Sequence, residues 1–598
     1  MMKTSSSRPL LCIAVGLGLL ATPSAAGAAP ALFVSPQQKT PDASPVTQIS
    51  LQGPPLRQIR GVTVKGSRSG RHAGKLRPYS GDRGASFIPD HRFTEGELVT
   101  VRIARAGAKT TTVSFTIARV GHLVLKPLIK RKPGAPMFNA AQTQAFLSRP
   151  DLHPPKIGAS TPAAQTDGAD IFIAPITAPP VNPKIAVKPI GPAGPMIVDA
   201  RGQLIWFAPR PPGQAALDFR PQTLNGQPVL TWWQGVIVPP GFGAGVGYIL
   251  DRSYKRIAVV RAGNGYASDL HEFALLPNGD ALVTVYAPIA RNLSKVGGSA
   301  HGVVLDTIAQ EIDIKTGLVV YEWHTDGRVS VHDSYTSPPS SGPWDPWHLN
   351  SIEQLANGNL LVSERDTWGV YEIDRASGHV ILRLGGKRSG YKLGPGARFA
   401  WQHDAHLQGR GLISLFDDEA APPEGKRSRG LLLRLNDRRH TATVVHQYVR
   451  PGKTLAGSQG NMQVLPNGNV FVGFGAEPFF SEFSAAGRLL FDGSLPRGDD
   501  SYRAYRAGWT GSPTEPPVIA AQRTAAGINV YASQNGATEV ASWQVIAGPD
   551  PGALAPVAQA PRSGFETPIA ARTGAPYVAA RALSASGQVL GTSAVAKP

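Results

Sequence analysis

Cysteine is almost absent from this chain of 598 residues, and the single one, Cys12, lies in an N-terminal apolar run. That run, 10–21, follows two basic residues and precedes the small residues Ala26-Gly27-Ala28. It is too short to span a bilayer, which takes ~20 apolar residues, so residues 1–28 are predicted to be a signal peptide and the protein to be secreted. The mature chain then has no disulfide and no thiolate, and it must fold by burial of apolar side chains alone.

Acidic residues are also scarce, with 41 Asp and Glu against 60 Lys and Arg, which gives a formal net charge of +19. The basic residues are scattered and no nucleic-acid-binding motif accompanies them, so we predict no nucleic-acid partner. A positive field suits anionic small molecules or an acidic cell surface, and association with the cell surface stays open. Few carboxylates argue against a glycosidase with two catalytic acids, although Asp404, Asp417 and Asp418 keep that class open.

A strand, an Asn-Gly turn and a second strand recur through the middle of the chain, at 273–285, 352–363 and 462–472, with weaker copies at 221–232 and 405–416. Asn-Gly between apolar runs is a strong hairpin signal. A second kind of hairpin alternates with the first, at 197–206, 312–320 and 371–381. Paired hairpins with a period of roughly 50 residues predict a β-propeller over 191–510, with six blades preferred. Two large antiparallel sandwiches are the alternative.

The flanking regions differ from this repeat, and together they predict an all-β protein. Residues 45–120 have short strands and glycine turns, which indicate an N-terminal Ig-like β-sandwich. Residues 125–190 are rich in proline and alanine and are expected to form an extended connector. Residues 514–598 alternate like a fibronectin-type-III sandwich, with Trp543 as the candidate buried tryptophan.

Polar side chains recur at one position of the repeat, directly before the first strand of each Asn-Gly hairpin. In a propeller these positions meet at one rim, as do residues that follow the returning strand. The set comprises His271, His348, Asn350, His403, Gln459 and Asn461, with Arg365, Asp417 and Asp418 after returning strands and Arg220 in the weakest copy. We therefore expect His271, His348 and His403 to converge.

Histidine, asparagine and arginine together offer hydrogen-bond donors and positive charge, which suit a tetrahedral oxyanion. The same three histidines could instead be metal ligands. The pair His403 and His406 is a poor zinc site, because side chains three apart on a strand point to opposite faces. The insertion 331–347 enters this rim, where Tyr335, Trp344 or Trp347 could stack on an aromatic substrate or simply hold the loop against the protein.

Three segments carry a family resemblance: Asp345-Pro346-Trp347-His348-Leu349-Asn350, Leu361-Val362-Ser363-Glu364-Arg365 and Trp401-Gln402-His403-Asp404. In combination they resemble the PAPS-independent bacterial arylsulfotransferases, over 170–490, and in particular the secreted actinobacterial type. The resemblance implies a six-bladed propeller and transfer of a sulfuryl group from an aryl sulfate to a phenol, by a ping-pong mechanism through a sulfohistidine. By position, His403 would be the nucleophile, with His348 and Arg365 as further catalytic residues and His271 and Asn350 as substrate-binding residues.

No metal and no cofactor are implied, and the repeat region contains no phosphate-binding glycine loop between a strand and a helix, so no nucleotide donor is predicted. Two alternatives stay open. One is a secreted propeller that binds an anionic ligand or partner at the histidine-lined rim without turnover. The other is a metal-dependent hydrolase. The sequence does not identify the natural donor and acceptor, or the oligomeric state.

Overall fold

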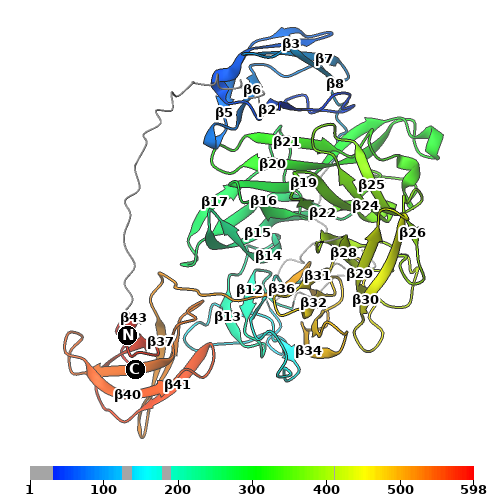
Figure 1. Cartoon of the computed structure of the whole chain (residues 1–598). Coiled ribbons are helices and arrows are strands. Elements are labelled where there is room, and N and C mark those ends of the chain that lie inside the picture. Colours follow the sequence, from blue (N-terminus) through cyan, green and yellow to red (C-terminus); the bar gives the residue numbers. More distant parts are fainter. Residues whose placement is uncertain (1–30, 124–137, 178–189, 410) are drawn as a thin grey trace, which may run out of the picture.

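A computed structural model describes residues 31–123, 138–177, 190–409 and 411–598 of the chain, and the described part is built from β-strands (Figure 1). The predicted signal peptide and parts of the predicted connector lie outside these residues. The helical segments among the described residues are short: η1 (Leu56–Gln58), η2 (Ser80–Asp82), η3 (Ser294–Val296), η4 (Val331–Asp333) and η5 (Arg365–Thr367). In the described residues, no helix has the length and apolar character needed to cross a bilayer.

Six sheets make up the centre of the described chain. The first three are β14 (Ala215–Leu224), β15 (Gln227–Val238), β16 (Phe242–Leu250) and β17 (Arg256–Val260); β18 (Phe273–Leu275), β19 (Asp280–Arg291), β20 (Gly302–Asp313) and β21 (Val319–His324); and β22 (Leu349–Gln354), β23 (Leu360–Glu364), β24 (Gly369–Ile373) and β25 (Val380–Gly385). The fourth is β27 (His403–Leu407), β28 (Leu412–Asp417), β29 (Arg429–Asn436), β30 (Thr441–Tyr448) and β26 (Lys392–Leu393). The fifth is β31 (Asn461–Val464), β32 (Val470–Gly473), β33 (Phe479–Phe483), β34 (Leu489–Ser494) and β9 (Gly158–Ala159), and the sixth is β36 (Ala504–Ala507), β10 (Asp170–Ile173), β12 (Met196–Val198) and β13 (Leu204–Phe207).

Successive sheets are neighbours in space through their first strands, except that β19, the second strand of its sheet, makes the contact with β22. β14 contacts β18, β19 contacts β22, β22 contacts β27, β27 contacts β31, β31 contacts β36, and β36 returns to contact β14. The sixth sheet joins the two ends of this series, because β10 and β36 pair antiparallel although more than 300 residues separate Ile173 from its partner Ala504. A small sheet of β11 (Ile176–Thr177) and β35 (Asp499–Asp500) lies next to that junction in the sequence.

The hairpins predicted from the Asn-Gly turns are present. β14–β15, β18–β19, β22–β23 and β31–β32 pair antiparallel across them. The four turn glycines have φ between 77° and 86°, in the left-handed region that glycine adopts without steric cost. The second set of predicted hairpins is present as β12–β13, β20–β21 and β24–β25.

The predicted connector needs a correction, because residues 158–177 contribute β9, β10 and β11 to the sheets. The predicted start of the repeat region at residue 191 is therefore too late. β10 is four residues long, and its Ile171, Phe172 and Ile173 are fully buried. Such a short apolar run with no adjacent Asn-Gly turn lacks the hairpin signal from which the repeats were identified.

The N-terminal region has two four-stranded sheets that share one apolar core, which includes Val64, Phe87, Val101 and Phe115. Hydrogen bonds from the Ser50 and Tyr79 hydroxyls to the carbonyl of Val319 fasten this region to β21 (2.6 and 2.9 Å). The sheets are β1 (Phe33–Ser35), β2 (Ile49–Gln52), β6 (Gly84–Pro89) and β5 (Gly74–Pro78), and β4 (Gly70–His72), β3 (Ile59–Gly66), β7 (Leu98–Arg105) and β8 (Thr111–Thr116).

The C-terminal region lies at the other end of the molecule, beside β12 and β13 (Figure 1). Trp543 is 2% exposed in its apolar core, as predicted. The Asn535 amide donates to the carbonyl of Phe207 (3.0 Å), which joins this region to the sixth sheet. Its sheets are β37 (Val518–Thr524), β38 (Gly527–Ser533) and β41 (Glu566–Ala571), and β40 (Ala555–Pro561), β39 (Ser542–Gly548), β42 (Tyr577–Leu583) and β43 (Val589–Thr592).

Candidate active site

A cavity of about 480 Å³ opens where the first strands of the central sheets begin. Four of the five predicted site residues line it: His271, His348, His403 and Arg365. His271 lies two residues before β18, His348 directly before β22, His403 at the start of β27, and Arg365 directly after β23. The equivalent positions in three successive sheets thus bring the three histidines to one place.

Each of these histidines is held through Nδ1 by an aspartate. The Nδ1–carboxylate distances are 2.6 Å for His271 with Asp269, 2.6 Å for His348 with Asp345 and 2.9 Å for His403 with Asp418. These carboxylates are residues that the sequence analysis did not select for this role. Asp269 and Asp345 could have been found, because each precedes its histidine by two or three positions. Asp418 belongs to a different strand end.

The hydrogen bond to the other nitrogen of His403 defines its tautomer. The backbone N–H of Gln459 donates to His403 Nε2 (3.2 Å), so Nε2 carries a lone pair and Nδ1 carries the hydrogen that is donated to Asp418. Burial, together with the nearby positive charge of Arg365, lowers the pKa of His403 well below its usual 6.5. His403 is therefore a neutral imidazole at neutral pH.

The pKa of His348 is shifted in the opposite direction. Burial alone would lower its pKa, but the Asp345 carboxylate, through charge and hydrogen bond, outweighs burial and raises the pKa above 6.5, with Asp366 adding to the effect. Its ring stands edge-on to His271 at a centroid distance of 4.7 Å. Burial lowers the pKa of His271, and Asp269 only partly opposes this. Two histidines whose pKa values are shifted in opposite directions thus lie side by side in the cavity.

The backbone at this rim is strained. His348 has φ +60° and Gln459 has φ +72°, in a region that residues other than glycine adopt infrequently. Such conformations cost on the order of 1–3 kcal/mol each and concentrate at functional sites. Here the strain accompanies the placement of the His348 ring and of the Gln459 N–H.

Arg365 forms a cationic part of the cavity wall. Its Nη1 donates to Asp366 (2.7 Å), its Nη2 donates to the carbonyl of Gly457 (3.1 Å), and the guanidinium lies over the ring of Trp401 at 4.7 Å. Among the described residues, its Nε has no hydrogen-bond partner. The side chain is held firmly and keeps one donor for a ligand.

Asn350 does not line the cavity, in contrast to its predicted contact with substrate. Its amide donates to the carbonyl of Gln402 (2.7 Å), and its backbone carbonyl accepts from Arg503 Nη2 (2.9 Å). Asn350 lies within β22, where its side chain contacts the residue before His403 rather than the cavity. It therefore positions the start of β27.

A buried ionic network that the sequence did not predict lies beneath these residues. Arg503, fully buried, pairs with Asp218 (3.0 Å) and Glu272 (3.2 Å). Arg220, expected at the rim, pairs instead with Glu272 and with Asp218 (3.2 Å). This network ties together strands from different sheets, and no local sequence pattern reveals Arg503.

Tyr502 is a second cavity residue that the sequence did not indicate. Its ring stands edge-on to His271 at 5.8 Å and to His403 at 6.5 Å. Its hydroxyl donates to the carbonyl of His271 (3.2 Å). Burial raises the pKa of Tyr502 well above 10, so the hydroxyl stays protonated and can act as a donor.

The candidate stacking residues of the 331–347 insertion have different positions. Trp347 is fully buried in the core, and Tyr335 stacks on Trp368 at a centroid distance of 3.5 Å. Trp344 does line the cavity, with its Nε1 donating to Thr336. His406, outside the cavity lining, pairs with Asp404 at 3.2 Å. Of the three aromatic residues, only Trp344 reaches the cavity.

The donor atoms at the cavity bear on the possibility of a metal. Among the described residues, Asp345, His348 and Asp366 form a group whose candidate ligand atoms all lie within 4.8 Å of one another. His271, His348 and His403 do not form such a group in the described part of the chain. The geometry therefore favours a carboxylate-rich cation position over the three-histidine site considered from the sequence.

Comparisons with known proteins bear on the region that contains this cavity. Residues 220–495 match the family model described as Arylsulfotransferase (ASST). No significant match was found among curated proteins. A solved structure of a Bacteroides caccae protein of unknown function is 13% identical, with 55% of this chain and 93% of that chain covered and a TM-score of 0.33. An auxiliary nutrient binding protein from Bacteroides ovatus is 12% identical, with 79% and 99% covered and a TM-score of 0.27.

At these TM-scores the two structures support no conclusion about fold or activity. The family match is independent of these structures. It extends from within β14 to β34 and includes four of the residues at the cavity, His271, His348, Arg365 and His403. The match over residues 220–495 supports the arylsulfotransferase family for this part of the chain.

Proposed function

We propose that this protein is a sulfotransferase that moves a sulfuryl group from an aryl sulfate ester to a phenolic acceptor through a sulfohistidine at His403. One observation carries the proposal. His403 is a neutral imidazole held by a carboxylate at Nδ1, in a cavity that also contains a guanidinium and a histidine with a raised pKa. The family match over 220–495 supports the same chemistry.

In the first half-reaction, the Nε2 lone pair of His403 attacks the sulfur of the aryl sulfate. The new N–S bond forms as the S–O bond to the aryl group breaks, and the phenolate leaves with that electron pair. His348, whose raised pKa favours the protonated form, donates a proton to the phenolate. The sulfated imidazole carries a positive charge on its ring, which the Asp418 carboxylate at Nδ1 offsets.

In the second half-reaction, a phenolic acceptor replaces the first product. His348, now neutral, takes the proton of the acceptor hydroxyl as its oxygen attacks sulfur. The N–S bond breaks and its electron pair returns to Nε2 of His403. This step restores both histidines to their starting charge states, so the cycle needs no cofactor.

Negative charge on the sulfuryl oxygens must be stabilised while the group is in transit. Arg365 has an Nε without a partner in the described part of the chain, and the backbone N–H of Gln459 points at His403 Nε2, the atom that would carry the sulfuryl group. Donors of this kind, fixed before reaction, are each worth about 10²–10³ in rate. His271 and Tyr502 also line the cavity, and the Tyr502 ring stands edge-on to both His271 and His403.

Architecture and location belong to the same proposal. The closed order of contacts between successive sheets, and the sixth sheet that joins both ends of the series, support a six-bladed β-propeller. The paired sheets at 31–118 and 518–592 support an N-terminal Ig-like sandwich and a C-terminal fibronectin-type sandwich. The predicted signal peptide at 1–28 supports secretion.

A metal-dependent hydrolase is the second candidate, favoured by the group formed by Asp345, His348 and Asp366. A divalent cation there would activate water next to the same substrate. The two candidates differ in their products, since a hydrolase releases phenol without an acceptor and loses activity on chelation. A transferase needs the acceptor and keeps its activity.

The test is release of the phenol from a chromogenic aryl sulfate, with and without a phenolic acceptor, by wild type and by His403→Ala. His301→Ala, at an exposed histidine outside the cavity, is the matched control. We expect release that depends on the acceptor, survives EDTA, is retained in H301A and is lost in H403A. Release of the phenol that persists in H403A would overturn the assignment of His403 as the nucleophile. No release from several donors by folded wild type would favour a protein that binds anionic ligands without turnover.

A further inference from the structure

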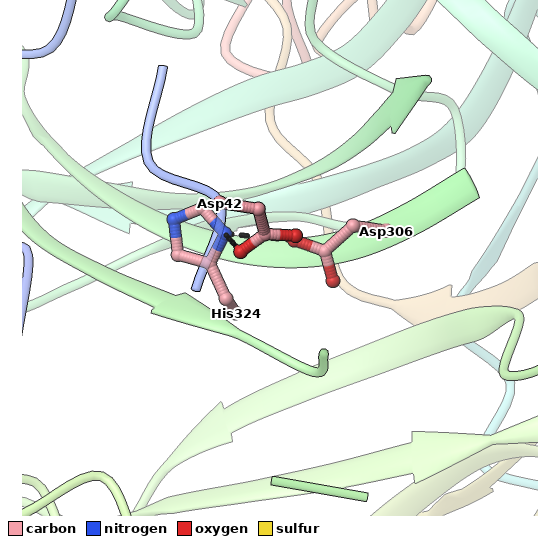
Figure 2. Close-up of side chains that lie close together, drawn as sticks. All are labelled: Asp42, Asp306 and His324. Atoms are coloured by element: carbon pink, nitrogen blue, oxygen red, sulfur yellow. Dashed lines mark hydrogen bonds and ion pairs between the residues drawn. The ribbon is translucent and has the colours of Figure 1, made fainter. Parts of the chain in front are cut away.

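A second cluster of ionisable side chains lies outside the lining of the cavity, where the N-terminal region meets β20 and β21. Asp42 reaches it from the segment between β1 and β2, Asp306 from β20 and His324 from the end of β21 (Figure 2). The three are 2%, 0% and 3% exposed. Asp42 is held there by its neighbour Ala43, whose backbone N–H donates to the carbonyl of Thr116 (3.0 Å).

Two carboxylates in this cluster compete for one nitrogen. His324 Nδ1 lies 2.7 Å from Asp306 Oδ2 and 3.2 Å from Asp42 Oδ1. A single N–H cannot satisfy both, and within the described residues neither oxygen of Asp42 has a hydrogen-bond partner. A buried carboxylate without donors is costly, because it loses its hydration and gains no hydrogen bond in return. Within the described residues, the Asp42 carboxylate therefore has no hydrogen-bond donor of its own.

The other side of the His324 ring is fixed by a third carboxylate. His324 Nε2 lies 2.9 Å from Glu322 Oε1, and Glu322 Oε2 accepts hydrogen bonds from the side-chain amides of Asn264 (2.8 Å) and Gln310. This is the arrangement in which a metal-binding histidine donates its remote N–H to a carboxylate. When only Nε2 carries a proton, as metal binding requires, the lone pair of Nδ1 faces Asp42 and Asp306.

The charges around the cluster do not balance within the described residues. Four buried carboxylates meet there, Asp42, Asp306, Glu322 and Asp326, and the ion pairs that they form involve two cations, His324 and Arg291. Arg291 is committed to Asp326, with Nη1 2.9 Å from Oδ1. Two negative charges remain even with His324 protonated, and a divalent cation would neutralise them.

The spacing of the donor atoms fits a metal ion. Bonds of about 2.0–2.2 Å to oxygen or nitrogen place neighbouring ligand atoms about 2.8–3.6 Å apart in octahedral or tetrahedral geometry. The distances from His324 Nδ1 to the two carboxylates, 2.7 and 3.2 Å, lie in or next to that interval, and all three candidate ligand atoms lie within 4.8 Å of one another. An imidazole with two carboxylates suits Zn²⁺ or Mn²⁺ better than Mg²⁺ or Ca²⁺, which prefer oxygen ligands alone.

We propose that Asp42, Asp306 and His324 form a binding site for a divalent transition-metal ion of the zinc or manganese class, which fastens the N-terminal sheets to β20 and β21. The site is separate from the cavity, and its role is structural. Without the metal, protonation must relieve the repulsion between the buried carboxylates. Burial together with the Asp306 carboxylate raises the pKa of Asp42 to about 7. Protons and metal therefore compete for Asp42.

The experiment uses the full mature chain. Metal content is measured by mass spectrometry after purification and after exposure of the chelator-treated protein to Zn²⁺ or Mn²⁺. Thermal unfolding of the chelated protein is then followed with Zn²⁺, Mn²⁺, Ca²⁺ or Mg²⁺ added. We expect one equivalent of Zn²⁺ or Mn²⁺ and an unfolding temperature that rises by about 2–8 °C when that metal is in excess.

Asp42→Asn is the decisive variant, because it keeps the shape of the side chain and removes its charge. In the absence of metal D42N should unfold at a temperature equal to or above that of wild type, since it relieves the repulsion between two buried carboxylates. When metal is added, D42N should not show the rise in unfolding temperature that wild type shows. Glu322→Gln should weaken metal binding by about 10–100-fold, as expected for loss of a carboxylate that orients a metal-binding histidine.

Two control variants distinguish this cluster from the other buried carboxylates of the protein. Asp280→Asn removes a buried carboxylate that pairs with Arg83 across the same interface, outside the cluster. It should lower the unfolding temperature and keep the metal increment. Asp345→Asn disrupts the group in the cavity and should also keep the increment. The proposal is overturned if wild type gains neither metal nor stability, or if D42N responds as wild type does.

Discussion

The cavity and the cluster beneath the N-terminal sheets both contain a buried histidine bonded to aspartate, yet the two histidines have opposite charge states. His403 has one carboxylate at Nδ1 and positive neighbours, Arg365 and His348, and its pKa is well below 6.5. His324 faces three carboxylates, and although burial opposes it, their charges raise its pKa well above 6.5. A histidine–aspartate pair by itself therefore indicates neither charge nor role. The surrounding charges decide both.

The two histidines also differ in the contacts of the ring nitrogen that is not bonded to aspartate. At His403 the nitrogen not bonded to aspartate keeps a lone pair on the cavity side, held only by the long hydrogen bond from Gln459. At His324 the equivalent nitrogen is bonded to Glu322. The first arrangement leaves a nucleophile for a substrate, and the second leaves none. The same substitution at the two places should therefore have different results.

The largest expected effect comes from Asp418→Asn compared with Asp42→Asn. An asparagine at 418 can donate its amide hydrogen to His403 Nδ1, which moves the ring proton to Nε2 and removes the nucleophilic lone pair. We expect kcat to fall by about 10²–10⁴-fold, as when the orienting carboxylate of a catalytic histidine is replaced. D42N should keep kcat within about twofold, because Asp42 does not belong to the lining of the cavity.

Steady-state rates of aryl sulfate turnover, with unfolding temperatures for both variants, provide the measurement. Equal losses in D418N and D42N would mean that both clusters act only through stability.

The next effect is the pH dependence of turnover. His348 must be protonated to donate to the leaving phenolate, so activity is present below its raised pKa and falls as pH rises through it. His403 must be neutral, and its lowered pKa places the acid limb well below pH 6.5. Asp345→Asn removes the main cause of the raised pKa, so the alkaline limb should move to lower pH.

This shift would reduce the rate at a fixed pH above the limb. The measurement is kcat/KM against pH for wild type, D345N and the exposed control Asp437→Asn, which should match wild type. An alkaline limb that is unchanged in D345N would remove His348 from the role of acid.

The smallest expected effect is on the pH dependence of thermal stability in the chelator-treated protein. The folded-state pKa of Asp42 is raised from 3.8 to about 7, so its stabilising proton is present at acid pH and lost as pH rises through about 7. His324 acts in the same direction, because its raised pKa gives stability that is complete below about pH 6.5 and lost on the alkaline side.

D42N lacks the first contribution, so its unfolding temperature relative to wild type should increase by about 2–4 °C from pH 5 to pH 8. Thermal unfolding of both proteins across that range measures it. A difference that stays constant with pH would show that Asp42 does not change its protonation on unfolding.

Much of the site followed from the repeat, because equivalent positions in repeated hairpins meet in space. The Asn-Gly turns placed His271, His348 and His403 at equivalent strand starts, and the structure has all three at one cavity. Arg365 was found in the same way from a returning strand. Asn350 was placed wrongly with respect to the cavity, since the contact of its side chain with Gln402 depends on the neighbouring sheet.

Other features have no local signal. β10 lies in a proline-rich stretch and pairs with a strand more than 300 residues away. Arg503 and Tyr502 lie between β35 and β36, outside every predicted hairpin. Tyr502 lines the cavity and Arg503 joins the buried ionic network because the sixth sheet joins both ends of the repeat series. Asp42 belongs to a different region from its partners Asp306 and His324.

The sequence alone determined the all-β class, the positions of the hairpins and the residues at their equivalent ends, because these depend on local periodicity and turn chemistry. Only the tertiary structure decided the charge state of each histidine, the carboxylate that holds it and the cluster at the N-terminal interface. Those properties depend on burial and on charges from strands that are distant in the sequence, which no local pattern contains.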